Sequence, residues 1–176
     1  ATRGKWSKPG AWNDPDYLQI GWIGGQRGTN FLAPHPCPLT PDEQYAYMSL
    51  WCLMAAPLFF SGDMQHLDEF TLNVLCNSEV IDVDQDPLGR SASVVRLTPQ
   101  TFLMVKELTD GTKAVGLFNQ GEAPAHVVAT WNAIGVNGKQ IVRDLWRQQD
   151  LGTFASEFSA EIPRHGVRFV RFQPAN

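Results

Sequence analysis

The hydrophobic and polar residues in the first half of the chain predict two short apolar strands, each followed by a helix. A strand is predicted at Tyr17–Trp22, where apolar residues are bounded by turn-forming Pro, Asn, Asp and Gly residues. Apolar residues spaced by three and four predict a helix over Gln44–Ala56, which Pro57 would end. A second apolar strand, Leu58–Phe60, and a second helix, Asp68–Cys76, follow. This order indicates parallel strands joined by a right-handed crossover.

The first helix has a well-specified start. Thr40 is a good N-cap, Pro41 suits the first helical position, and Glu43 stands where it closes a capping box. Apolar residues occupy most of the helix circumference, so we expect this helix to be largely buried.

Two parallel strands cannot form a stable sheet by themselves, because both edges of the sheet would stay unpaired. The first half therefore needs strands that this sequence does not contain. We expect them to come from the rest of a longer chain or from a second chain, and we expect residues 1–86 to be unstable without them.

The second half of the chain has the period of two that is typical of strands. Six segments alternate or are apolar throughout, and turns such as Thr109-Asp110-Gly111 separate them. The predicted strands are Val94–Leu97, Thr101–Leu108, Lys113–Asn119, Ala125–Trp131, Gln140–Leu145 and Val167–Phe172. This pattern predicts an antiparallel β-sandwich or small barrel. The change of period after Asp86 divides the chain into two predicted domains, 1–86 and 87–176.

Composition and charge support this division. The chain is 43% hydrophobic with a formal net charge of −4, which is typical of a globular protein and argues against a nucleic-acid partner. Residues 1–86 carry four basic and eleven acidic side chains, and residues 87–176 carry ten and seven, so most candidate carboxylates lie in the first domain. No window approaches the roughly 18 apolar residues of a membrane span. We expect a small uncharged partner or another protein, and neither nucleic acid nor membrane.

The cysteines and histidines have no spacing typical of a metal site. Cys37, Cys52 and Cys76 leave two interpretations open, one disulfide or free buried thiols, and the second is favoured. The sequence also has no GxSxG elbow of the kind that serine hydrolases use. We expect neither a metal nor a cofactor.

Carboxylates stand near the ends of the predicted strands. In Asn13-Asp14-Pro15-Asp16, the two aspartates could do acid–base chemistry or accept hydrogen bonds from sugar hydroxyls. The alternative is that the segment is a polar turn. Asp63, after the second strand, is a similar candidate, and an N-cap or a turn is the favoured alternative.

Two other groups of residues accompany these carboxylates. Trp12, Tyr17 and Trp22 could form an apolar wall for a sugar ring, or could belong to the core. Three alternating aspartates predict the solvated or hydrogen-bonded face of a strand, because their spacing is not that of a calcium loop. These three are Asp82, Asp84 and Asp86.

Four motifs follow one another in the first domain, and two more occur in the second. The first four are Pro9 to Leu18 with Ile20-Gly21, Thr40 to Glu43, Leu50 to Asp63, and Val80 to Gly89. The last two are Val142 to Trp146 and Ile162 to Val167. Together they resemble the melibiase-type, α-galactosidase-like enzymes of glycoside hydrolase family 27, and the resemblance covers nearly the whole chain.

The resemblance implies an α/β plus all-β fold: the last two βα units of a (β/α)8 TIM barrel, strands 7 and 8, followed by an antiparallel β-sandwich. It also implies hydrolysis of terminal α-D-galactosides with retention. The family's nucleophile and acid/base aspartates belong to the fourth and sixth strands, and neither motif occurs here. We therefore assign no catalytic residue to this chain, and we expect the chain in isolation to be inactive.

The resemblance assigns a substrate-binding role to Asp16 and Tyr17. The family usually has Met at the position of Tyr17 and Asn at that of Asp84, so the sugar stays open: galactose comes first, and α-N-acetylgalactosamine, β-arabinose and isomaltose units are alternatives. Two alternatives are not enzymes: a carbohydrate-binding module and a non-catalytic structural fragment. The expected partners are an oligosaccharide or smaller substrate and the remainder of the barrel, and the resemblance favours a secreted or periplasmic location.

Overall fold

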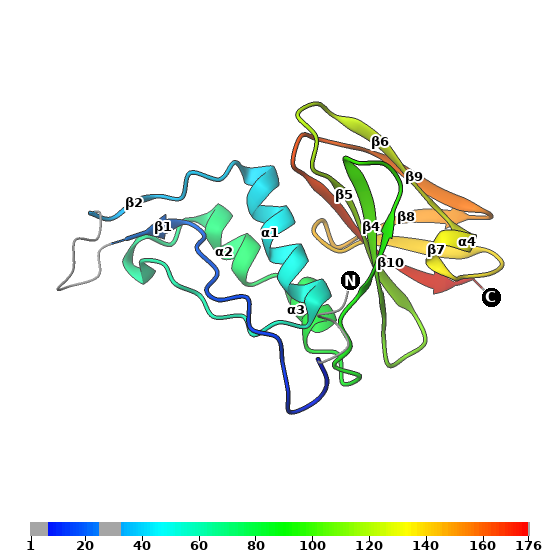
Figure 1. Cartoon of the computed structure of the whole chain (residues 1–176), viewed down its shortest axis with the longest axis horizontal. Helices are drawn as coiled ribbons and strands as arrows, with labels where there is room; N and C mark the ends of the chain where they lie inside the picture. Colours follow the sequence, from blue (N-terminus) through cyan, green and yellow to red (C-terminus); the bar gives the residue numbers. More distant parts are fainter. Residues whose placement is uncertain (1–6, 25–32, 176) are drawn as a thin grey trace.

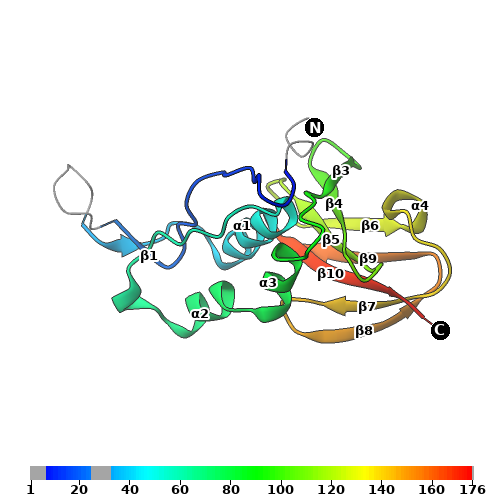
Figure 2. The same cartoon turned by 90° about the horizontal axis from the view of Figure 1, so that it is seen from below.

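The computed structural model describes residues 7–24 and 33–175. Among these residues, the three longer α-helices lie on one side, and the β-sandwich, which carries a short fourth helix, lies on the other, with helix α1 (Pro41–Met54) between them (Figure 1). The view turned by 90° shows α1 and α3 (Ser78–Asp84) against the sheet that contains strand β10 (Val167–Pro174) (Figure 2). The helical part and the sandwich are therefore packed directly on each other.

The predicted parallel strands are present as a short parallel contact. Leu18 forms a parallel bridge with Phe60: the Leu18 N–H donates to the carbonyl of Phe59 (2.7 Å), and the Ser61 N–H donates to the carbonyl of Leu18 (2.9 Å). Beyond it, β1 (Trp22–Ile23) pairs antiparallel with β2 (His35–Pro36). The regular strand expected over residues 17–22 is thus reduced, because few neighbouring strands fix its backbone.

Helix α1 begins as the sequence predicts. The Thr40 side chain accepts from the Glu43 N–H, and the Glu43 carboxylate accepts from the Thr40 N–H (2.8 Å), so the capping box is complete. The helix ends at Met54, two residues before the expected Ala56, because Ala55 adopts a left-handed conformation with φ of 51° and its N–H bonds to the carbonyls of Cys52 and Trp51.

Helix α2 (Glu69–Leu75) agrees with the prediction, but the predicted aspartate strand is wrong. The segment with Asp82 and Asp84 is the helix α3, which Asn77 caps by accepting from the Val80 N–H. Val80 and Val83, three residues apart, are its buried positions. Helical and alternating patterns are hard to tell apart in seven residues, and the cap decides here.

The second half forms the predicted antiparallel sandwich. Its larger sheet has the strand order β3-β4-β5-β10-β7-β8, and β6 pairs with β9 across from it. The strands not yet given are β3 (Ser93–Arg96), β4 (Thr101–Glu107), β5 (Lys113–Asn119), β6 (Ala125–Thr130), β7 (Gln140–Asp144), β8 (Gln149–Phe154) and β9 (Glu157–Ile162).

Two strands and one helix of the sandwich are not predicted from the sequence. Strand β8 is an edge strand with mostly exposed polar residues, and β9 buries little besides Phe158 and Ile162. Trp131, expected at the end of a strand, begins the short helix α4 (Trp131–Ile134). Strands with few apolar residues show little of the alternating pattern by which a strand is predicted. They form because they pair with neighbouring strands.

The central strands of the larger sheet are buried on both faces. Along β4, Leu103 and Val105 face the core shared with β6 and β9, whereas Met104 faces the core shared with the helices. Gly116 on β5 allows α1 to approach closely, since a Cβ there would lie 2.8 Å from a methyl group of Leu53. The helical part and the larger sheet therefore share one hydrophobic core.

Lys106 is wholly buried at this interface. Its Nζ donates to the carbonyls of Cys52 (3.0 Å) and Val83 (2.6 Å), near the C-terminal ends of α1 and α3, and to that of Asp84 (3.4 Å). Helix C-terminal ends carry partial negative charge, which suits an ammonium group. Burial lowers the pKa of Lys106, against the pull of the Asp84 carboxylate. One strand residue thus connects two helices to the sandwich.

The three cysteines are free thiols, and they differ in environment. Cys52 is buried, Cys37 is half-buried and Cys76 is exposed. The prediction that the thiols are buried is therefore confirmed only for Cys52. None of the helices in the described residues is long and apolar enough to cross a membrane.

Replacing Lys106 by Met should destabilise the chain by about 2 kcal/mol or more. Met keeps most of the side-chain volume, but it removes the side-chain donor to the buried carbonyl of Val83 and one of two donors to that of Cys52, which also accepts from the Ala55 N–H. A buried acceptor left unsatisfied costs roughly 1–3 kcal/mol. Chemical denaturation gives the free energy of unfolding. Lys113→Met is the matched control: Lys113 pairs with the more exposed Glu107, and losing that pair should cost less than about 1 kcal/mol. Equal losses in the two variants would contradict the role of Lys106.

Asp84 should make stability fall as pH rises. Burial raises the pKa of Asp84 from 3.8 to about 7, while Lys106 opposes the shift. The folded chain then keeps a proton that the unfolded chain loses near its ordinary pKa, so stability declines between about pH 4 and pH 7 and levels off above. Asp84→Asn should flatten this decline in denaturation curves recorded across that range. Asp82→Asn, on the exposed side of the same helix, should leave it unchanged, and an unaltered slope in Asp84→Asn would rule out this assignment.

Candidate functional site

Three residues singled out in the sequence line one cavity. Asp14, Asp16 and Tyr17 border it together with Phe59, and its volume is about 380 Å³. Tyr17 and Phe59 are 53% and 52% exposed, whereas Leu18 is buried against the helices. Successive residues of an extended segment point to opposite sides, so Tyr17 faces away from the core.

The backbone of Asp16 has a conformation that non-glycine residues rarely adopt, with φ of 84°. The Asp16 N–H donates to Oδ1 of Asp14 (2.9 Å), and Oδ1 of Asp16 accepts from the Tyr17 N–H (2.8 Å). The segment is thus a polar turn, as one interpretation of the sequence expects. Such strained residues cost about 1–3 kcal/mol and cluster at functional sites. The turn interpretation and a binding role are therefore compatible.

Helix α1 holds this turn from the other side. Tyr47 donates its hydroxyl hydrogen to the carbonyl of Tyr17 (2.8 Å), and Trp51 donates its indole N–H to the carbonyl of Asp16 (3.4 Å). The two donors are one helical turn apart, and their rings meet edge to face with centroids 4.3 Å apart. Burial raises the pKa of Tyr47, so its hydroxyl stays protonated and able to donate.

Asp63 is not among the residues that line this cavity, and it caps a short helix. Its carboxylate accepts from the Gln65 N–H (2.8 Å) at the start of η2 (Met64–His66) and contacts Nδ1 of His66 (2.8 Å). The Gln65 N–H, and after it His66, lower the pKa of Asp63. The N-cap interpretation of Asp63 is confirmed.

The aromatic wall proposed from Trp12, Tyr17 and Trp22 does not form. Trp22 stacks on His66, with ring centroids 4.9 Å apart. Trp12 lines a different pocket of about 350 Å³, which includes Asp84. Only Tyr17 of the three lines the cavity with Asp16.

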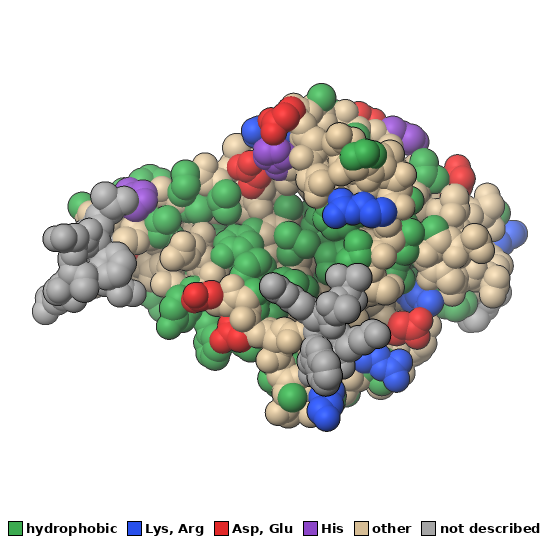
Figure 3. All heavy atoms as spheres, viewed as in Figure 1, with side chains coloured by type: hydrophobic (Ala, Val, Ile, Leu, Met, Phe, Trp, Pro, Cys, Tyr) green, Lys and Arg blue, Asp and Glu red, His purple; other side chains and the backbone are tan. Residues whose placement is uncertain are grey.

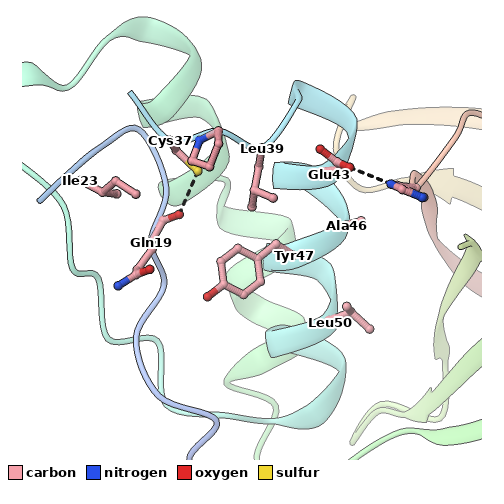
Figure 4. Close-up of a pocket in the computed structure, with 10 residues that line it drawn as sticks. Gln19, Ile23, Cys37, Leu39, Glu43, Ala46, Tyr47 and Leu50 are labelled. Carbon is pink, nitrogen blue, oxygen red and sulfur yellow. Dashed lines mark hydrogen bonds and ion pairs between the residues drawn. The ribbon is translucent and has the colours of Figure 1, made fainter. Parts of the chain in front are cut away.

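An open groove of about 570 Å³ runs along α1, with mostly apolar walls (Figure 4). Hydrophobic side chains gather on this face of the molecule, with acidic and histidine side chains at its upper edge (Figure 3). The apolar residues that line the groove include Ile23, Leu39, Ala46 and Leu50.

His165 connects the rim of this groove to the sandwich. Its Nδ1 lies 2.7 Å from Oε1 of Glu43, and its Nε2 lies 3.1 Å from Oε1 of Glu122. The contact with His165, and after it the bonds from Thr40, lower the pKa of Glu43 to about 2. Glu43 therefore serves both the capping box of α1 and the contact between the two parts.

The sequence does not predict the roles of Phe59, Tyr47 and Trp51. Its apolar pattern expects Phe59 in a buried strand and Trp51 on a buried helix face. The two helix residues bond to backbone carbonyls 30 and 35 positions away. No local pattern marks such bonds, because carbonyl oxygens occur at every residue.

Sequence comparison finds two family profiles in order along the chain. Residues 4–86 match the profile described as alpha galactosidase A. Residues 100–172 match the alpha galactosidase C-terminal beta sandwich domain. Both parts of the chain are therefore similar to one kind of enzyme.

Individual relatives agree with these profiles. Alpha-galactosidase 2 of Arabidopsis thaliana is 33% identical over 93% of this chain, which spans 38% of that protein. A GH27 β-L-arabinopyranosidase from Geobacillus stearothermophilus is 31% identical with a TM-score of 0.86, over 94% of this chain and 38% of that one. Alpha-galactosidase I from Mortierella vinacea is 28% identical with a TM-score of 0.82, over 96% and 41%. The chain thus spans about two fifths of its relatives.

Glycine and alanine at position 16 should have different effects on stability. Asp16→Gly relieves the positive φ, so the free energy of unfolding should stay within about 1 kcal/mol of the original or rise. Asp16→Ala keeps the strain and should be less stable than Asp16→Gly by roughly 1 kcal/mol. Denaturation of the three chains measures this order.

The matched control reverses the order. Asp82 lies on the exposed side of α3, where Gly should be less stable than Ala by about 1 kcal/mol. If Ala were the more stable residue at position 16 as well, the strain assigned to Asp16 would be wrong.

Proposed function

The chain belongs to glycoside hydrolase family 27, the melibiase or α-galactosidase family, and from this we propose that it is part of a retaining enzyme that cleaves terminal α-D-galactosyl residues. Its fold is that of the last two βα units of a (β/α)8 barrel followed by an antiparallel β-sandwich. The observation that carries the proposal is the ordered match of both parts of the chain to α-galactosidases. We also propose the division into domains 1–86 and 87–176.

Asp16 and Tyr17 bind the substrate in this proposal. The Asp16 carboxylate accepts hydrogen bonds from sugar hydroxyls, and such charge-assisted bonds are stronger than neutral ones. Tyr17 offers an exposed ring and a hydroxyl at the border of the same cavity. The strained turn supports this role, because it fixes the direction of both side chains.

The hydrolysis itself uses two aspartates from outside this chain. In a retaining enzyme a nucleophile and an acid/base stand about 5–5.5 Å apart on the two sides of the scissile bond. By family resemblance these belong to barrel strands 4 and 6, so Asp14 and Asp63 take neither role. The chain alone is then inactive.

The remainder of the barrel comes from a longer chain or a second chain. Two features support this partner: the exposed Tyr17 and Phe59, which would face the barrel interior, and the apolar groove along α1. Large exposed apolar surfaces on a folded protein commonly mark an interface.

Tyr17 supports a second candidate substrate. A β-L-arabinopyranoside has the ring of an α-D-galactoside without its hydroxymethyl group, and the Geobacillus relative is a β-L-arabinopyranosidase. A side chain bulkier than the family's usual Met leaves less room beside the sugar. Comparing hydrolysis of the 4-nitrophenyl glycosides of these two sugars therefore distinguishes the two candidate substrates.

The proposal predicts no turnover of either glycoside by the purified 176-residue chain, and turnover once the rest of the barrel is present. In that complete enzyme, Asp16→Asn should lower kcat/KM about 10- to 150-fold, because a hydrogen bond to a charged group contributes roughly 1.5–3 kcal/mol. Tyr17→Met should shift the ratio of the two kcat/KM values toward the galactoside.

Asp82→Asn, an exposed carboxylate on α3 away from the cavity, is the control and should keep full activity. Turnover by the verified chain alone that survives Asp16→Ala would contradict the proposal. So would a complete enzyme that hydrolyses neither glycoside.

A further inference from the structure

We infer that Tyr47 and Trp51 are positioning residues, which hold the Asp16–Tyr17 turn in the strained conformation that presents both side chains to the sugar. This inference rests on the proposed function for its link to substrate. The geometry that carries it is independent of that function.

The hydrogen bonds fix consecutive peptide planes. The Asp16 N–H is held by Asp14, the next peptide plane by Trp51 at its carbonyl, and the one after it by Tyr47 at the carbonyl of Tyr17. A peptide unit is rigid and planar, so holding its carbonyl also fixes its N–H. The Cα atom of Tyr17 lies between two held planes, which sets the direction of its side chain.

A strained residue needs such support. With φ of 84°, Asp16 would relax toward a common backbone conformation unless its surroundings prevent this. The Trp51 bond is long at 3.4 Å and the Tyr47 bond is short at 2.8 Å, so Tyr47 is the stronger of the two. The edge-to-face contact of the two rings keeps each in place for its bond.

Helix α1 can supply this support because it is itself rigid. A capping box fixes its N-terminal end, a left-handed residue with backbone bonds ends it, and Lys106 binds the carbonyl of Cys52 near that end. Tyr47 and Trp51 thus project from a helix that is fixed at both ends. The sandwich therefore acts on the sugar-binding turn through α1.

Tyr47→Phe removes only the hydroxyl, and Tyr45→Phe is the matched control. Tyr45 lies on the same helix, but its hydroxyl accepts from the side chain of Asn73 and makes no bond to the turn. In the 176-residue chain, Tyr47→Phe should accelerate amide hydrogen exchange at residues 16–18 about fivefold or more, the equivalent of about 1 kcal/mol for one hydrogen bond. Trp51→Phe should act in the same direction, and Tyr45→Phe should leave exchange at these residues unchanged.

In the complete enzyme, Tyr47→Phe should raise KM for the better glycoside about fivefold while kcat changes less than twofold. Tyr45→Phe should change neither. A merely structural role would instead lower the free energy of unfolding in both variants and leave KM alone.

Equal exchange rates in Tyr47→Phe and Tyr45→Phe would overturn the inference, and so would an unchanged KM despite faster exchange. If the complete enzyme with its original sequence hydrolyses neither glycoside, the proposed function fails. The exchange comparison then still decides whether Tyr47 and Trp51 hold the turn.

Discussion

Lys106 bonds to the carbonyl ends of two helices from within the sandwich, and the arrangement of the whole chain depends on this contact. A wholly buried ammonium group needs acceptors, and Cys52 and Val83 supply them at 3.0 and 2.6 Å. The ammonium group can stay in this interface only while both helix ends supply acceptors, because a buried charge without acceptors is far more costly than a lost apolar contact. The place of α1 on the sheet follows from this constraint.

This contact explains how two βα units keep an ordered core. Parallel strands with unpaired edges are not expected to be stable alone. Here α1 packs on β4, β5 and β10 as well as on α3, and the cluster that includes Leu53, Met104 and Phe118 is continuous across both parts. The sandwich thus supplies an apolar partner for one side of the helical part.

The same helix borders two surfaces with different properties, and Tyr47 lies at both. On one side, Tyr47 and Trp51 hold the turn with Asp16, whose cavity is bordered by exposed Tyr17 and Phe59. Along the helix runs the apolar groove, which ends at Glu43 and His165. In the proposed longer enzyme both surfaces would face the rest of the fold, since this chain spans about two fifths of its relatives.

The sequence by itself determined the features that short-range rules control. The capping box at Thr40 and Glu43, the Asp63 cap, most strands of the sandwich and the family motifs with Asp16 and Tyr17 all follow from nearby residues. Only the tertiary structure decided that β8 pairs with β7 and β9 with β6, that Lys106 is buried, and that Tyr47 and Trp51 hold a turn 30 and 35 residues away. The physical reason is range: caps and periodicity act over a few residues, whereas burial and carbonyl bonding depend on segments that meet only after the chain has folded.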